Sequence, residues 1–347
     1  MQNRNRHIII LFSLTVMLIC HCNTGILHAQ NDSKQKLALQ YFQEGAFEKS
    51  AQLYEELYAE RPNEYFYRYY INSLLELKDY KTAERFIKEE QKRKRIRKNF
   101  TVELAYIYLQ EGNIKKSERF FENAINEVEA TRQGVYELTN ALIIRGQYDY
   151  AILAYQKGRK LLNGSYNFHI ELAGLYQTMR NYSAMMDEYL TMLEADEAHL
   201  ETVEVRLQHL INVVDDEECK SIIRDKLIEK AQKNPKNLIF SEMLLWYTIQ
   251  IKDFPIALVQ AKALDKRTDD KGERVYELGV LAASNDFFDE AIDAFNYVIA
   301  LGPENYLHLN AQIKLLETKY NLLEHRDGFD KKELLQLEKE YNHVLGL

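Results

Sequence analysis

The sequence predicts an all-α protein made of successive helix pairs. Seven times, a turn residue is followed two positions later by an aromatic residue (once Ile), and three positions after that by Ala, Ser or Met. The turn residues are Gly45, Lys78, Gly112, Gly146, Arg180, Lys252 and Asp286, spaced by 33 or 34 residues except for one interval of 72. A fixed period of this length is typical of stacked helix pairs. It favours a repeat protein over an enzyme, and a content of only 4 prolines suits a mostly helical chain.

Residues 1–29 have the pattern of a secretory signal peptide. Arg4 and Arg6 form a basic flank, an apolar stretch follows over residues 8–20, and a cleavage site is expected before Gln30. This stretch is shorter than the roughly 20 apolar residues needed to span a membrane. We therefore expect an exported, periplasmic protein without a membrane span in its mature chain.

A lipid anchor at Cys20 or Cys22 is the alternative for this N-terminal segment. Lipidation needs a small residue before the cysteine, whereas Ile19 and His21 occupy those positions. Cleavage before Gln30 would remove two arginines and change the formal net charge from −8 to −10. An acidic exported chain is not expected to bind nucleic acid.

The third copy of the pattern shows how each pair is expected to pack. Gly112 lets the chain leave the first helix in a left-handed conformation. Small residues at Ala105 and Ser117 allow the two backbones to approach closely. Tyr108 and Phe121 fill the space beside that contact, as close packing requires.

The same pattern recurs in the first copy and in the last clear one. The first has Leu37, Ala38, Tyr41, Ser50, Tyr54 and Pro62, and the last has Leu278, Gly279, Ala291, Phe295 and Pro303. From about residue 31 to 305 the chain resembles the tetratricopeptide repeat family. This resemblance implies a right-handed superhelical solenoid of about seven to eight antiparallel helix pairs, whose first helices line a concave face. A short signal followed directly by repeats also resembles envelope proteins of the Bacteroidota.

We divide the mature chain into four segments. Residues 30–199 hold five repeats, 200–237 a degenerate helix pair with Asp215 or Asp216 as a cap, and 238–305 further repeats. The terminal pair, 306–347, is expected to break at Asp327-Gly328 and to resume from Lys331. Its last helix has an apolar face of Leu334, Leu335, Leu337, Tyr341 and Leu345. This face predicts a cap on the stack, with a docking surface as the alternative.

The resemblance also implies which residues line the concave face. They are Tyr65, Arg68, Asn72, Asn99, Tyr106, Tyr136, Asn140 and Gln177. Asn and Gln there can hold the backbone amides of an extended peptide, and an ordinary solvated groove is the alternative. Gln35 and Leu39 stand where the family's clamp for acidic C-termini needs basic and Asn residues, so no such clamp is expected.

Two further clusters exceed the repeat pattern. The run Tyr65-Phe66-Tyr67-Arg68-Tyr69-Tyr70 should expose some rings for peptide or sugar recognition, unless all pack between the first two repeats. The basic run consists of Lys92, Arg93, Lys94, Arg95, Arg97 and Lys98. It indicates either binding to an anionic lipid or acidic partner, or a solvated helix C-terminus whose cations complement the helix dipole.

The sequence predicts no catalytic site, metal or cofactor. The histidines are scattered, and no phosphate loop or nucleophile elbow is present. The leading hypothesis is an exported, non-enzymatic scaffold that binds a protein or peptide along its concave face, in secretion or outer-membrane assembly. The alternatives are a glycan-binding helical envelope protein and an α-helical wall-lytic enzyme.

Overall fold

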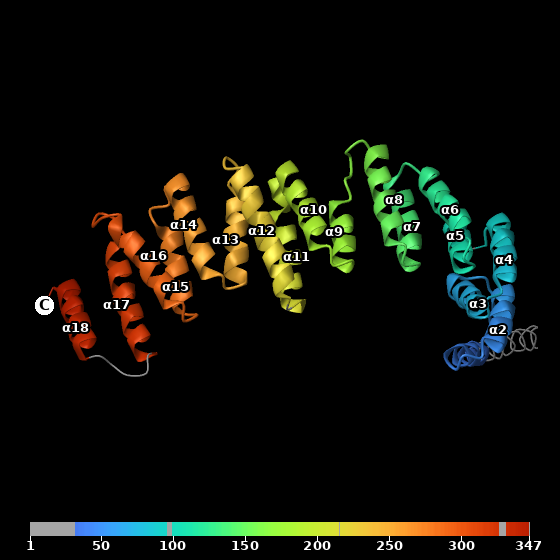
Figure 1. Cartoon of the computed structure of the whole chain (residues 1–347), viewed down its shortest axis with the longest axis horizontal. Coiled ribbons are helices and arrows are strands. Elements are labelled where there is room, and N and C mark those ends of the chain that lie inside the picture. The colour runs from blue at the N-terminus through green and yellow to red at the C-terminus, as the bar shows by residue number, and fades with distance from the viewer. Residues whose placement is uncertain (1–31, 96–98, 215, 326–330, 347) are drawn as a thin grey trace, which may run out of the picture. The chain divides into compact units, whose positions relative to one another are not determined.

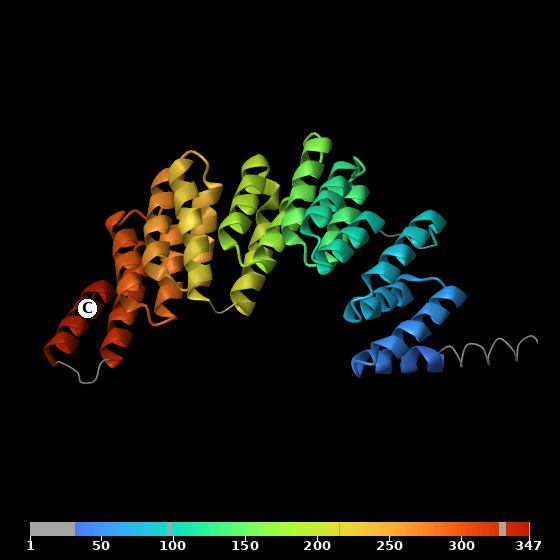
Figure 2. The same ribbon diagram turned by 45° about the vertical axis from the view of Figure 1, so that its right-hand side comes forward.

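The computed structural model describes residues 32–95, 99–214, 216–325 and 331–346. Throughout these residues the regular secondary structure is helical, without a strand, which confirms the predicted all-α fold class. The chain divides into two compact units, Met1–Phe168 and His169–Leu347. Within each unit the helices are stacked in succession along the chain (Figures 1 and 2), and the helices of a repeat, such as α9 and α10 or α15 and α16, pack against each other.

The first helix in the described part of the N-terminal unit covers residues 32–43. The helices that follow are α2 (Phe47–Glu60), α3 (Glu64–Glu76), α4 (Tyr80–Arg93), α5 (Phe100–Gln110), α6 (Ile114–Asn126), α7 (Arg132–Ile144) and α8 (Tyr148–Leu161). Helices α5 and α6 form one pair, and α7 and α8 the next.

The C-terminal unit continues the succession of pairs. Its α-helices are α9 (His169–Thr178), α10 (Tyr182–Ala195), α11 (Leu200–Val213), α12 (Glu217–Lys233), α13 (Ile239–Gln250), α14 (Phe254–Thr268), α15 (Glu273–Ala283), α16 (Phe288–Ala300), α17 (His308–Glu324) and α18 (Lys331–Leu345). A short 3-10 helix, η1 (Glu197–His199), lies between α10 and α11. No helix in the described part of the chain is both long and apolar enough to cross a membrane.

The seven predicted turns share one backbone conformation. Every turn residue, glycine or not, has a positive φ between 57° and 84°. In each, the next amide donates to a carbonyl five residues back, as Asn113 does to Tyr108 O at 2.9 Å and Asp79 to Leu74 O at 2.9 Å. This is the Schellman arrangement that satisfies the last carbonyls of a helix. The predicted register of the repeat is therefore correct at all seven turns.

The residue after each turn is the N-cap of the next helix. Asp79, Asn113, Asn181 and Asp253 accept a hydrogen bond through their side chains from the backbone amide three residues later. The aromatic or Ile position of the pattern is then the first residue of the second helix in all seven copies. In these four copies one short segment thus ends one helix and caps the next.

The small positions of the pattern lie where the two helices of a pair touch. All seven are buried, namely Ser50, Ala83, Ser117, Ala151, Met185, Ala257 and Ala291. Serine is tolerated there because its hydroxyl donates to a carbonyl of the facing helix: Ser117 Oγ to Ala105 O at 2.8 Å and Ser50 Oγ to Ala38 O at 3.2 Å. A buried hydroxyl without such a partner would destabilise the contact.

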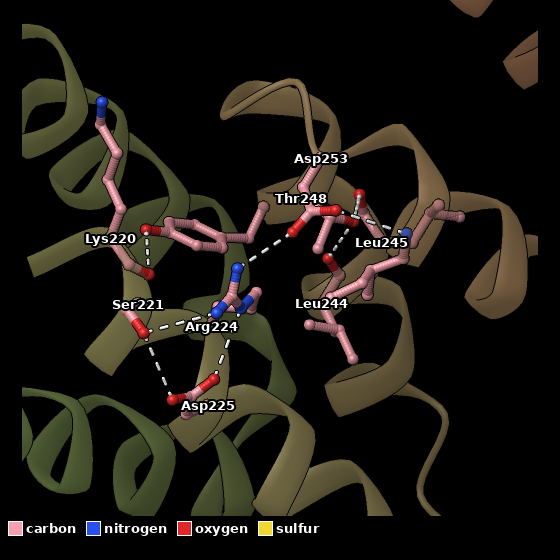
Figure 3. Close-up of polar contacts among 10 residues, drawn as sticks. Lys220, Ser221, Arg224, Asp225, Leu244, Leu245, Thr248 and Asp253 are labelled. Carbon is pink, nitrogen blue, oxygen red and sulfur yellow. Dashed lines mark hydrogen bonds and ion pairs between the residues drawn. The ribbon is translucent and has the colours of Figure 1, made fainter. Parts of the chain in front are cut away.

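The irregular segment forms two helices, α11 and α12, of which α12 packs against α10 and α13, and α11 against α13. Asp216 caps α12 by accepting a hydrogen bond from Glu218 N at 3.0 Å, whereas Asp215 lies outside the described residues. Figure 3 shows how α12 reaches the following pair: Arg224 donates to Asp253 Oδ2 at 3.2 Å, and within α12 it also donates to Ser221 Oγ at 3.4 Å. Because Asp253 also caps α14, α12 is linked to the start of a regular second helix.

The terminal helix α18 packs by less of its apolar face than the sequence predicts. Leu337 is buried against Leu316 and Leu323, but Leu334 and Leu335 are 42% and 48% exposed. The expectation that both belong to the packing face is therefore wrong. The predicted break at Asp327-Gly328 lies outside the described residues.

Candidate binding surface of the N-terminal unit

A surface groove of about 560 Å³ lies among α3, α5, α6 and α7. Two residues of the predicted concave face, Asn99 and Asn140, line it. The other lining residues are Glu64, Thr101, Ala124, Glu127, Val128, Glu129, Gly134, Glu137, Leu138, Ala141 and Ile144. Helices α3, α5 and α7 are the first helices of their pairs, but α6 and the loop after it also line the groove, and of the predicted concave residues only Asn99 and Asn140 do so.

Arg145, at the end of α7, connects α7 with two other first helices of the unit, α5 and α3. Its Nη2 lies 2.5 Å from Glu103 Oε2 on α5, and its Nη1 donates to Asn72 Oδ1 on α3 at 3.3 Å. The guanidinium also lies 4.7 Å from the centre of the Tyr106 ring. Both charged side chains are buried, at 8% and 2% exposure.

The buried carboxylate next to Arg145 affects the pKa of the guanidinium. Burial opposes a charge on Arg145, but the Glu103 carboxylate outweighs it and raises the pKa of the guanidinium. Tyr67 lies beside the pair, and its pKa is raised well above the usual value, first by burial and then by Glu103. The predicted residues Asn72 and Tyr106 are thus brought together, but in an internal contact. Arg145 and Glu103 were missed because nothing in the repeat pattern pairs positions 42 residues apart.

Asn99 and Asn140 differ in what they do. Asn99 caps α5, because its Oδ1 accepts a hydrogen bond from Val102 N at 3.1 Å. Asn140 is exposed on α7. Of the two, Asn140 is the better placed to meet a ligand.

Tyr136 belongs to a different cluster on the same helix. Arg132 donates to the hydroxyls of Tyr136 at 2.9 Å and Tyr166 at 3.0 Å, and its guanidinium lies 3.9 Å from the centre of the Tyr166 ring. The Tyr136 ring meets Phe168 edge-on. These contacts order the end of the N-terminal unit.

The aromatic run on α3 is internal packing. Phe66, Tyr67 and Tyr70 are buried, while Tyr65 and Tyr69 are partly buried against the same core. Of the two interpretations of this run, packing between the first two repeats is therefore the one that the structure supports, because α2 and α4 cover α3 on both sides. Arg68 is exposed and lies 5.8 Å and 5.3 Å from the centres of the Tyr65 and Tyr69 rings. The run forms no open stacking platform for a sugar.

One residue of the basic run at the end of α4, Arg95, forms an internal ion pair with Glu90. Arg95 Nε donates to Glu90 Oε2 at 3.0 Å, and Tyr58 donates to the same oxygen at 2.6 Å. Burial of Glu90 opposes its charge, but Arg95 and Tyr58 outweigh burial and hold its pKa below the usual value. Arg93 lies 3.3 Å from Glu89.

The rest of the run matches the expected helix C-terminus. Lys92 is in the last turn of α4, and Lys94 adopts a left-handed conformation as its C-cap. Both are exposed, while Arg97 and Lys98 lie outside the described residues. Binding of this run to an anionic partner stays a prediction.

Gln177, the remaining predicted residue, lies in the C-terminal unit. It lines a separate pocket of about 610 Å³ together with Glu201, Thr202, Val205, Arg206 and His209 of α11. Among the described residues, no group of three or more His, Cys, Asp or Glu side chains is arranged to hold a metal ion.

No family model matches the sequence, and no curated protein does. Among solved structures, a tetratricopeptide repeat protein from Parabacteroides merdae is 12% identical over 83% of this chain and 98% of its own, with a TM-score of 0.24. The C-terminal part of a TPR repeat-containing protein from Cytophaga hutchinsonii is 14% identical over 80% and 98%, with a TM-score of 0.27. A chain of the APC/C hetero-tetramer Cut9–Hcn1 is 15% identical over 82% of this chain, with a TM-score of 0.25, and this chain spans 55% of its length. Similarity this low adds nothing about a site, so the fold class rests on the helix pairs themselves.

Proposed function

We propose that the protein is a non-enzymatic scaffold that binds a segment of another protein in the groove among α3, α5, α6 and α7. The observation that carries this proposal is the mixed character of the groove. Asn140 offers an exposed amide, and Ile144 on the same helix is 66% exposed. An exposed apolar side chain beside polar groups is typical of surfaces that bind proteins.

The proposal includes export to the periplasm and a role in secretion or outer-membrane assembly. Its support is the signal pattern of residues 1–29, which lie outside the described residues. The repeat pattern and the absence of a readable catalytic motif support a binding protein over an enzyme.

Substitution of Ile144 tests the proposal. Tagged protein would be crosslinked in cells, and its partners would be identified by mass spectrometry after envelope fractionation. Ile144→Arg should abolish recovery of the partner. The matched control is Leu153→Arg on α8, because Leu153 is also exposed, at 49%, but does not line the groove.

Two results would reject the proposal. One is equal recovery of the partner by both variants, which would place the binding surface elsewhere. The other is specific retention on peptidoglycan without any protein partner, which would support the glycan-binding alternative.

A further inference from the structure

We infer that the groove selects a basic segment of its partner, in which Lys or Arg residues alternate with apolar ones. This inference rests on the proposed function and specifies the chemistry of the ligand. Three observations support it: the charges that line the groove, the contacts of the two nearest arginines with other groups, and the apolar residues of α7.

Four carboxylates from separate elements meet at the groove. Glu64 begins α3, Glu127 and Glu129 follow α6, and Glu137 lies on α7. Among the described lining residues none is Lys, Arg or His. The whole chain carries 45 Lys and Arg against 53 Asp and Glu, so this segregation of charge is local. A surface with charges of one sign attracts a partner of the opposite charge and weakens the binding of partners of the same charge.

The two arginines of the α7 segment do not neutralise the groove. Arg132 donates to the hydroxyls of Tyr136 and Tyr166. Arg145 is paired with Glu103 at 2.5 Å and is almost completely buried. Both cations are thus engaged in other contacts, and neither forms an ion pair with Glu64, Glu127 or Glu129.

The apolar residues of the groove favour a ligand that carries apolar side chains as well as positive charges. Leu138, Ala141 and Ile144 are spaced by three residues along α7, and Val128 faces the same groove. Lys and Arg side chains carry long aliphatic stems that can cover such apolar residues while their charged ends reach the carboxylates. An apolar residue between two basic ones would cover Ile144, which is otherwise 66% exposed.

Gly134 sets the position of one carboxylate. A Cβ at this position would lie 2.7 Å from Glu129 Cβ and 2.9 Å from Glu129 O. The tight approach is stabilised by Thr131, whose Oγ1 accepts a hydrogen bond from Gly134 N at 3.0 Å. The loop that carries Glu129 is therefore held directly against the first turn of α7.

The test compares two fluorescently labelled peptides of equal length, one alternating Lys with Ala and Leu, the other with Glu in place of Lys. Binding to the purified full chain is measured by anisotropy at two ionic strengths. We expect the Lys peptide to bind more tightly and to lose affinity at higher salt, because exposed charge pairs are screened. The Glu64→Gln/Glu127→Gln/Glu129→Gln variant should bind it about tenfold more weakly.

The control variant is Glu111→Gln/Glu118→Gln/Glu122→Gln, which removes the same charge from exposed residues that do not line the groove. It should keep its affinity, and circular dichroism must show both variants folded. Equal binding of the two peptides, or an equal loss in the control, overturns the inference. If Ile144→Arg still abolishes recovery of a cellular partner, such a result leaves the proposed function standing. Loss of both effects rejects the two together.

Discussion

Arg145 and Glu103 form a buried ion pair between α7 and α5, with Nη2 and Oε2 2.5 Å apart. Removing one partner would leave the other charge buried and uncompensated. Arg145→Ala should therefore lower the free energy of unfolding by about 3 kcal/mol or more, measured by urea denaturation. Arg145→Met combined with Glu103→Leu should recover much of this loss, because no charge then remains buried.

The matched control is Glu89→Ala, since Glu89 pairs with Arg93 on the surface of α4. That change should alter stability by less than about 1 kcal/mol. A loss on Arg145→Ala no larger than the control would show that the pair is not buried as described.

Two helical glycines of the C-terminal unit should respond in opposite directions to substitution by alanine. A Cβ at Gly279 would lie 2.9 Å from both Ala294 Cβ and Phe295 Cε1, whereas Gly174 has no neighbour within 4 Å of that position. Gly279→Ala should destabilise the protein by about 1–3 kcal/mol through overpacking. Gly174→Ala should stabilise it by about 0.5–1 kcal/mol, because alanine favours the helix. Thermal denaturation of both variants measures the difference, and a gain on Gly279→Ala would refute the close contact of α15 and α16.

The non-glycine turns should tolerate glycine well. Lys252 has a φ of 59°, a conformation that costs an L residue about 1 kcal/mol. Lys252→Gly should therefore leave stability unchanged or raise it slightly, while Gly112→Val should lower it by more than about 1 kcal/mol. A similar loss in both variants, measured by melting temperature, would argue against a shared turn conformation.

Stability at acid pH should depend on Glu90. Burial opposes its charge, but hydrogen bonds from Arg95 and Tyr58 hold its pKa below that of an unfolded Glu. A carboxyl with a lowered folded pKa stabilises the protein above its unfolded pKa, and this contribution is lost as pH falls through the folded value. Wild type should therefore lose more stability than Glu90→Gln between neutral pH and about pH 3. Equal slopes of unfolding free energy against pH would contradict the ion pair.

Cys219 should react only when the protein unfolds. Its side chain is buried in α12, and burial raises the pKa of the thiol to about 11. Near pH 8 the folded protein then has far less thiolate than an unfolded cysteine of pKa about 8.5. Alkylation of the Cys219 peptide, followed by mass spectrometry, should rise only with denaturant. Rapid labelling of the native protein would show that α12 is open to solvent.

The repeat could be predicted because it is local. The turn, the cap and the small buried position lie within six residues, as at Gly112, Asn113 and Ser117, so their spacing is visible in one stretch of sequence. The same holds for α12, whose cap at Asp216 precedes it directly.

The contacts of Arg145 could not be predicted from local spacing. Asn72 and Tyr106 were placed on the correct helices, but only the structure shows Arg145 between them, 73 residues from Asn72. The sequence left two interpretations of the aromatic run on α3 open for a related reason. A helix packed between two neighbours buries rings on most of its circumference, and one helix considered alone cannot show that.

The most direct test of the groove as a protein-binding site is photo-crosslinking in cells from an artificial amino acid at position Asn140. The control position is Glu122, which is exposed on α6 and does not line the groove. A defined peptide of one partner protein joined to position 140, with none joined to position 122, is the expected result. Crosslinks of equal yield from both positions, or none from position 140 while the partner still copurifies, would contradict the assignment of the groove.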